Sequence, residues 1–144
     1  MKQAIGAVSL LVRDYGEAVD FYTRVLRFEV VQDVPLGGGR RWILLGPPGS
    51  CECRVLLSRA KNEEEAQAIG RQAGGRVFLF LHTDDFDRDY REMRQRGVRF
   101  VEEPRREEYG TVAVFEDLYG NKWDLLMPAK PAAARPASQP RRQI

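Results

Sequence analysis

The chain has 144 residues, of which 43% are hydrophobic and 31% are charged, and its formal net charge is +2. This composition is that of one soluble domain, large enough to bury a hydrophobic core. Its apolar runs are far shorter than the roughly 20 residues of a membrane-spanning helix, and its first residues lack the apolar segment of a signal peptide. We therefore expect a cytoplasmic protein without a membrane partner.

The positive charge is concentrated in the last seventeen residues, 128–144. This segment carries four basic side chains and no acidic one, so the chain's +2 less the segment's +4 leaves −2 for residues 1–127. Its Pro and Ala content and its lack of apolar periodicity predict a disordered tail. Because no aromatic side chains are interleaved with the basic ones, nucleic-acid binding is not expected.

The hydrophobic pattern of the first part of the chain predicts the order strand, helix, strand, strand, strand. Apolar residues recur at helical spacing in one segment and alternate with polar ones in the others. Glycine and proline separate the last three strands. The strands are expected at 5–12, 28–34, 41–45 and 52–58, and the helix at 15–26.

After a polar connector the same order begins again. Asp84 or Asp85 is expected to cap a helix that stops at Gly97. Setting each residue against the one 70 positions later aligns the two halves, which indicates an internal repeat. Strands are expected at 76–83, 98–102, 109–115 and 121–127. The predicted division is a first module at 1–58, a connector at 59–75, a second module at 76–127 and the tail at 128–144.

Three stretches of the sequence carry a family resemblance: Val12 to Phe28, Asp84 to Phe100 and Asp117 to Leu125. Through them the chain resembles the vicinal oxygen chelate superfamily, which includes glyoxalase I, bleomycin-resistance and extradiol-dioxygenase proteins. The resemblance covers nearly everything before Pro128. It implies an α+β fold in which two βαβββ modules pair into a curved mixed sheet, with a concave cleft and helices on the outside.

The resemblance also implies four positions where metal-dependent members carry His or Glu. Here they fall at Ala7, at Phe78, within 54–56, where Leu56 fits best, and at Asp124. One carboxylate, or two if Glu52 is counted, is short of the three or four ligands that hold a transition metal. We expect no metal and no other cofactor, which argues against a metal-dependent glyoxalase or dioxygenase.

The residues expected in the cleft suit a small organic molecule, because aromatic walls with a few charged groups are typical of such sites. Alternatively, Arg54 and Asp124 neutralise each other, since a buried unpaired charge is costly. Lys122 is expected near one end of the cleft, and Trp42 and Tyr109 on loops or neighbouring strands. Strand alternation on the family pattern points the following side chains inward: Ser9, Glu52, Arg54, Phe78, Phe80, His82 and Asp124.

The favoured function is that of a metal-free, bleomycin-resistance-like protein that sequesters or senses a small organic ligand. An alternative is a lyase, isomerase or dioxygenase-like enzyme that uses His82, Glu52 or Asp124 for acid/base catalysis, with His82 and Asp124 as the favoured catalytic residues, or that holds a metal in an atypical way. For His82, a structural hydrogen bond is the competing interpretation. A third hypothesis is an interaction protein with a vestigial pocket. A homodimer is expected, because the sheet edges should be exposed in a single chain and because members of the superfamily commonly dimerise.

Overall fold

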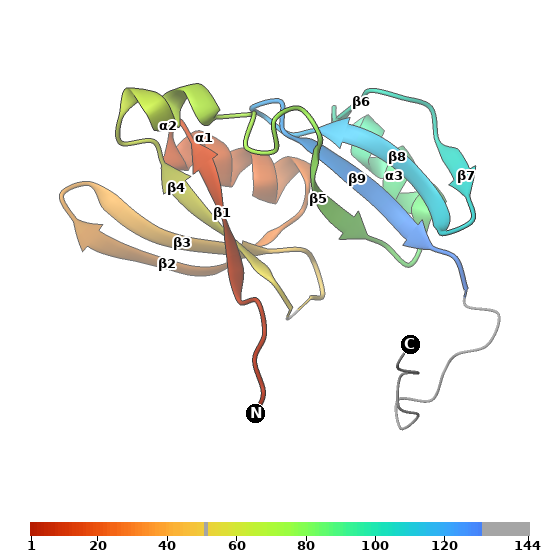
Figure 1. Ribbon diagram of the computed structural model, residues 1–144, viewed down its shortest axis with the longest axis horizontal. Coiled ribbons are helices and arrows are strands. Elements are labelled where there is room, and N and C mark those ends of the chain that lie inside the picture. Colours follow the sequence, from red (N-terminus) through yellow and green to blue (C-terminus); the bar gives the residue numbers. More distant parts are fainter. Residues whose placement is uncertain (51, 131–144) are drawn as a thin grey trace, which may run out of the picture.

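The computed structural model describes residues 1–50 and 52–130 of the chain (Figure 1). The predicted disordered tail therefore lies outside the described residues from position 131 onward. Within the described part, no helix combines the length and the apolar character needed to cross a membrane.

The first module has the predicted order of elements. Its sheet runs β1-β4-β3-β2, with β1 parallel to β4 and the other neighbours antiparallel. Asp14 begins the helix, because its side chain accepts a hydrogen bond from the backbone N–H of Glu17 at 2.9 Å. The elements are β1 (Ala7–Val12), α1 (Tyr15–Asp20), the π-helical turn η1 (Phe21–Val25), β2 (Glu29–Gly37), β3 (Arg40–Gly46) and β4 (Arg54–Arg59).

The second module repeats the order after the connector. Its sheet runs β5-β9-β8-β6, and β7 also pairs with β8. Asp85 caps the helix by accepting from the N–H of Arg88, and Gly97 follows the helix with φ 93°. The elements are α2 (Glu63–Ala68) in the connector, then β5 (Val77–His82), α3 (Phe86–Gln95), β6 (Arg99–Phe100), β7 (Arg105–Glu107), β8 (Gly110–Glu116) and β9 (Lys122–Pro128).

Several local features differ from the predictions. The last turn of the first helix is the π-helical turn η1. After it, Arg27 takes φ 65°, a conformation in which glycine is usual. The N–H of Phe28 then donates to the carbonyl of Tyr22. Strand β4 begins at Arg54, two residues later than predicted. The short strand β7 was not predicted, because three charged residues carry no apolar alternation.

The α+β class is confirmed, and the two modules share one hydrophobic core. In the described residues they form two separate mixed sheets, side by side in Figure 1, and no strand pair joins them. The core joins them instead: the ring of Trp123 in β9 lies 6.1 Å from that of Tyr22 and 5.8 Å from that of Phe28. Leu10 and Leu125 are also fully buried in this core. One face of each sheet is therefore committed to packing.

Asp117, in the turn between β8 and β9, fastens the modules to each other. One of its carboxylate oxygens accepts hydrogen bonds from the hydroxyl of Tyr22 at 2.6 Å and from the side-chain amide of Asn121 at 2.9 Å. The other accepts from the backbone N–H groups of Tyr119 and Asn121. Burial and the Asp117 charge raise the pKa of Tyr22 well above its usual value, so that hydroxyl remains a donor.

Removing the Tyr22 hydroxyl tests this contact. We expect Tyr22→Phe to lower the free energy of unfolding by about 1.5–3 kcal/mol, because a buried hydrogen bond to a carboxylate is lost. Urea denaturation followed by circular dichroism measures the change. Tyr90→Phe is the matched control, since no hydrogen bond of the Tyr90 hydroxyl is found within the described residues. Equal losses in the two variants would contradict the role given to Asp117.

Candidate ligand-binding site

Within residues 1–50 and 52–130, no element covers the face of the first sheet opposite the core. On this face Ser9 pairs with Leu56, and Leu56 pairs with Leu44. In the next row Leu11 pairs with Ser58, and Trp42 of β3 lies on the same side. Because Val8, Leu10, Val55 and Leu57 point to the core, the opposite face carries leucines, one tryptophan and two hydroxyls at its centre. Arg54, which pairs with Ala7, lies on the same face, as do Gln32 and Val34 of β2, which pair with Leu44 and Trp42.

A cavity of about 690 Å³ lies at one end of this face. Its size and its apolar lining with a few polar groups are typical of sites for small organic molecules. The apolar and hydroxyl part of the lining comes from Ser9, Leu11, Tyr15, Leu36, Trp42, Leu56, Leu57, Ser58 and Ala60. The more polar part comes from Arg40, Arg41, Arg59, Lys61, Glu65 and Gln72.

Two side-chain amides hold the walls of this cavity. Gln72, from the connector, accepts from the N–H of Leu11 at 2.7 Å and donates to the carbonyl of Ser9 at 3.0 Å. Gln32 of β2 accepts from the indole N–H of Trp42 at 3.0 Å. Although its side chain is 40% exposed, Trp42 is thereby fixed in orientation. Both walls are preorganised before any ligand binds.

The second sheet has an equivalent face. Here Phe80 pairs with Asp124 and Asp124 with Val114, while His82 pairs with Leu126. Phe80 is 59% exposed, whereas Asp124 is only 7% exposed. His82 and Asp124 are diagonal neighbours on the same face. Thus Asp124 occupies the position in the second sheet that Leu56 occupies in the first.

Asp124 is a buried carboxyl that forms no ion pair with any described residue. Its Oδ1 atom is buried and has no hydrogen-bond partner in the part of the chain described. Burial raises the pKa of this carboxyl; the charge of Arg105 opposes the effect and that of Glu102 adds to it. Arg105 itself is bound to Glu102 at 2.8 Å and to Glu107 at 2.7 Å. The Oδ1 atom of Asp124 is therefore a buried hydrogen-bond acceptor that no described group satisfies.

The donor set of the two faces does not fit a metal ion. Ala7, Leu56 and Phe78 hold three of the four positions at which metal-dependent relatives are expected to carry ligands. Within residues 1–50 and 52–130, no group of three His, Cys, Asp or Glu side chains is placed to coordinate a cation.

The structure separates the residues that the sequence analysis placed in one cleft. Ser9 and Trp42 line the first cavity, and Phe80, His82, Lys122 and Asp124 lie on the second face. Tyr109 lies in the β7–β8 turn with its side chain 52% exposed.

Phe78 and Glu52 have other surroundings than predicted, whereas Arg54 lies on the predicted face, opposite Ala7, but has another partner. Phe78 packs against the core, because a register shift between Val77 and Leu79 breaks the alternation of β5. Glu52 precedes β4 and is exposed, so it does not belong to the inward face. Arg54 donates to the carbonyl of Ser50 at 2.6 Å and forms no ion pair with Asp124. The proposed mutual neutralisation of Arg54 and Asp124 is therefore wrong within one chain.

Sequence reasoning missed several residues of the first cavity. Leu11 could have been predicted, because it is two residues from Ser9 in the same strand and therefore points to the same face. Arg40 and Arg59 lie at strand ends and Gln72 lies in the connector. Charged and amide residues at such places have no periodicity that would distinguish them from an ordinary solvated surface.

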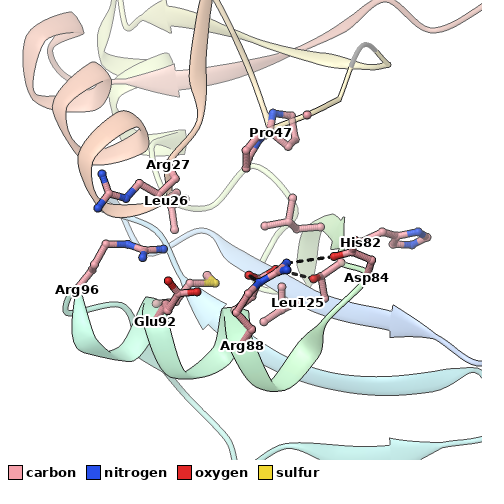
Figure 2. A pocket seen from close by; sticks show the side chains of 15 residues that line it. Leu26, Arg27, Pro47, His82, Asp84, Arg88, Glu92, Arg96 and Leu125 are labelled. Atoms are coloured by element: carbon pink, nitrogen blue, oxygen red, sulfur yellow. Dashed lines mark hydrogen bonds and ion pairs between the residues drawn. The ribbon is translucent and has the colours of Figure 1, made fainter.

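A second cavity, of about 580 Å³, lies between the modules beside α3 (Figure 2). Its charged groups are largely satisfied within the chain: Arg88 bonds to Asp84 at 3.0 Å and to Asp89 at 2.9 Å. Although burial raises the pKa of Asp89, hydrogen bonds from Arg88 and Thr83 lower it below its usual value. Arg96 donates to the carbonyl of Val25 at 2.6 Å and so joins α3 to η1. We call this cavity the seam cavity, because it follows the contact between the two modules; His82 lies at its edge.

The fold and the two open faces define a known class of protein. Residues 4–125 match the model of the Glyoxalase/Bleomycin resistance protein/Dioxygenase superfamily, and the chain belongs to that superfamily. It is 54% identical over 127 residues to an uncharacterized protein of Shewanella frigidimarina, covering 88% of this chain and 94% of that one.

Two solved structures show the same architecture. The crystal structure of UcmS2 is 33% identical, with a TM-score of 0.75, and covers 88% of this chain and 98% of its own. TnmS3, described as an antibiotic binding protein from Streptomyces sp. CB03234, is 28% identical, with a TM-score of 0.73, and covers 89% and 98%. The resemblance stated from the sequence is therefore confirmed at the level of the superfamily.

The pKa of Asp124 gives a prediction about stability and pH. A carboxyl whose folded-state pKa is raised above its ordinary value of 3.8 favours the folded state most at low pH, where it is protonated. This contribution to stability is lost as the pH rises from the pKa of the carboxyl in the unfolded state to its pKa in the folded state. We therefore expect the free energy of unfolding of Asp124→Asn, relative to wild type, to increase from pH 3.5 towards pH 7.

Chemical denaturation at a series of pH values measures this difference. Glu108→Gln is the control, because Glu108 is exposed and makes no hydrogen bond or ion pair within the described residues. A difference between Asp124→Asn and wild type that stays constant with pH, or that follows the Glu108→Gln control, would show that burial does not perturb this carboxyl.

Proposed function

We propose that this protein binds a small organic molecule on the uncovered faces of its sheets, without a metal, and acts by sequestration or as a sensor. The observation that carries the proposal is the cavity of about 690 Å³ over the first sheet, with its fixed Trp42 and apolar floor. The donor set, which lacks three of the family's metal-ligand positions, argues for binding rather than metal-dependent catalysis.

The description of one related protein also supports the binding of a small organic molecule. TnmS3, a structural neighbour in the superfamily, is described as an antibiotic binding protein. Antibiotics are small organic molecules, and an aromatic and aliphatic face suits a large apolar body of this kind. The ligand of this protein is proposed to be of comparable chemistry, with its own polar groups facing Asp124 or the hydroxyls of the first sheet.

The arrangement of His82 and Asp124 on the second face supports one alternative function, that of an enzyme. His82 and Asp124 are diagonal neighbours there, and a buried carboxylate with a raised pKa is a suitable general base. In an enzyme of lyase or isomerase type, these two side chains would transfer protons to and from a bound substrate. Loss of turnover in His82→Ala, with ligand binding retained, would favour this alternative.

We also propose that two chains associate into a homodimer that completes the site. In the part of one chain that the structure describes, both proposed ligand faces are open, and the edge strand β2 exposes Val30, Val31, Val34 and Leu36. Exposed apolar side chains on a free strand edge favour association with another chain. A second copy would cover these residues and wall in the cavity.

Light scattering coupled to size-exclusion chromatography tests the dimer. We expect twice the chain mass for wild type, and a shift towards the monomer when Val31→Lys and Val34→Lys are combined, because two buried charges would oppose association. Lys at the exposed Glu64 and Glu108 is the matched control. A monomeric wild type at micromolar concentration would contradict the proposal.

Binding itself is tested by a screen for compounds that raise the melting temperature, since a ligand that binds only the native state must stabilise it. For a compound found in this way, we expect Trp42→Ala to weaken binding about tenfold, because a buried aromatic contact is lost. Isothermal titration calorimetry gives the affinities, with Leu118→Ala, remote from the cavity, as control. A screen without any stabilising compound would favour an interaction protein with a vestigial pocket.

A further inference from the structure

The cavity over the first sheet has a cationic rim. Arg59, at the end of β4, lies with its guanidinium carbon 5.0 Å from the centre of the Tyr15 ring. Arg41 approaches the same ring at 5.6 Å, and its backbone N–H donates to the Tyr15 hydroxyl. Contact with an aromatic ring stabilises a guanidinium and holds its planar group in one orientation. The rim is therefore ordered, although it is accessible.

Two of the basic side chains at this rim are already neutralised. Arg41 forms an ion pair with Asp33, and Lys61 lies 3.9 Å from Glu65. Arg40 and Arg59 form no ion pair with a carboxylate anywhere in residues 1–50 and 52–130. Four basic side chains and a single acidic one line the cavity. A positive charge thus remains at the mouth of an apolar site.

The remainder of the lining is suited to an apolar ligand body. Leu11, Trp42 and Leu56 form the floor, and Ser9 and Ser58 supply small polar groups. The seam cavity beside α3 differs in this respect, because its three arginines are matched by three carboxylates. A net positive rim is therefore a property of the cavity over the first sheet and not of both cavities.

We propose that the cavity over the first sheet selects ligands that combine an apolar, aromatic body with an anionic group, which Arg59 and Arg40 bind at the rim. The body rests on Trp42 and the leucines, and the anion accepts hydrogen bonds from the guanidinium groups, whose geometry matches carboxylate, sulfonate and phosphate oxygens. This inference rests on the proposed function, because it names the class of molecule that the site takes.

A pair of fluorescent probes separates the anionic group from the apolar body. Anilinonaphthalene sulfonate carries one sulfonate, and phenylnaphthylamine has the same aromatic frame without it. We expect wild type to bind the sulfonate probe roughly three- to tenfold more tightly than the neutral one, the range for a partly exposed charge-assisted contact. Added salt should reduce this preference, because the contact is screened at the surface.

The variants assign the preference to particular residues. Arg59→Gln and Arg40→Gln are each expected to weaken binding of the sulfonate probe severalfold and to leave the neutral probe unchanged. Arg59→Lys retains the charge and should keep most of the affinity. Arg91→Gln removes an exposed arginine of α3 outside the cavity and should change nothing. Melting temperatures establish that each variant is folded.

The possible results distinguish this inference from the function on which it rests. If both probes bind wild type with equal affinity, and Arg59→Gln and Arg40→Gln bind them as wild type does, the cavity binds apolar molecules and the anionic specificity is wrong. If neither probe binds and no screened compound stabilises the protein, the proposed function fails as well. A loss for both probes in Arg59→Gln would mean that Arg59 supports the cavity wall and does not recognise an anion.

Discussion

The carboxylate of Asp117 is the contact on which the arrangement of the two modules depends. It accepts four hydrogen bonds, one from the first module through the Tyr22 hydroxyl and three from the β8–β9 turn itself. Because the turn is fixed, β9 leaves it with Trp123 facing the aromatic core and Asp124 facing away. One short polar cluster thereby helps to fix which residues of β9 pack in the core and which face the other side of the sheet.

The shared core explains why the ligand faces are open. The helices and the aromatic cluster of Tyr22, Phe28 and Trp123 occupy one side of each sheet, so neither sheet can use its other side for packing within the chain. On the first sheet, hydrogen bonds from Gln32 and Gln72 hold the Trp42 side chain and the backbone of Ser9 and Leu11 in place. The two faces also differ in charge, since the first has an arginine rim and the second a buried carboxylate.

The periodic parts of the structure could be predicted from the sequence, and the irregular parts could not. The sequence pattern predicted a helix cap at Asp84 or Asp85, and Asp85 is observed to cap α3. The alternation along β9 that directs Asp124 to one face also accounts for the burial of Trp123 and Leu125 on the other. The placement of Phe78 failed because one extra residue in β5 changes which side its ring faces. The placement of Glu52 failed because β4 begins only at Arg54, so the strand alternation does not extend to position 52. The arginine rim depends on tertiary contacts of Tyr15, which no periodicity records.

The Gln72 side chain has a consequence for how the first sheet meets other chains. Its amide bonds to the N–H of Leu11 and the carbonyl of Ser9 as a neighbouring strand would, on the side of β1 that faces away from β4. The unpaired N–H and carbonyl groups of a free strand edge can pair with another chain and cause aggregation. Here the Gln72 side chain already binds one N–H and one carbonyl in the middle of the β1 edge. The connector between the modules therefore also blocks strand addition at β1, and leaves β2 as the edge of this sheet open to partner chains.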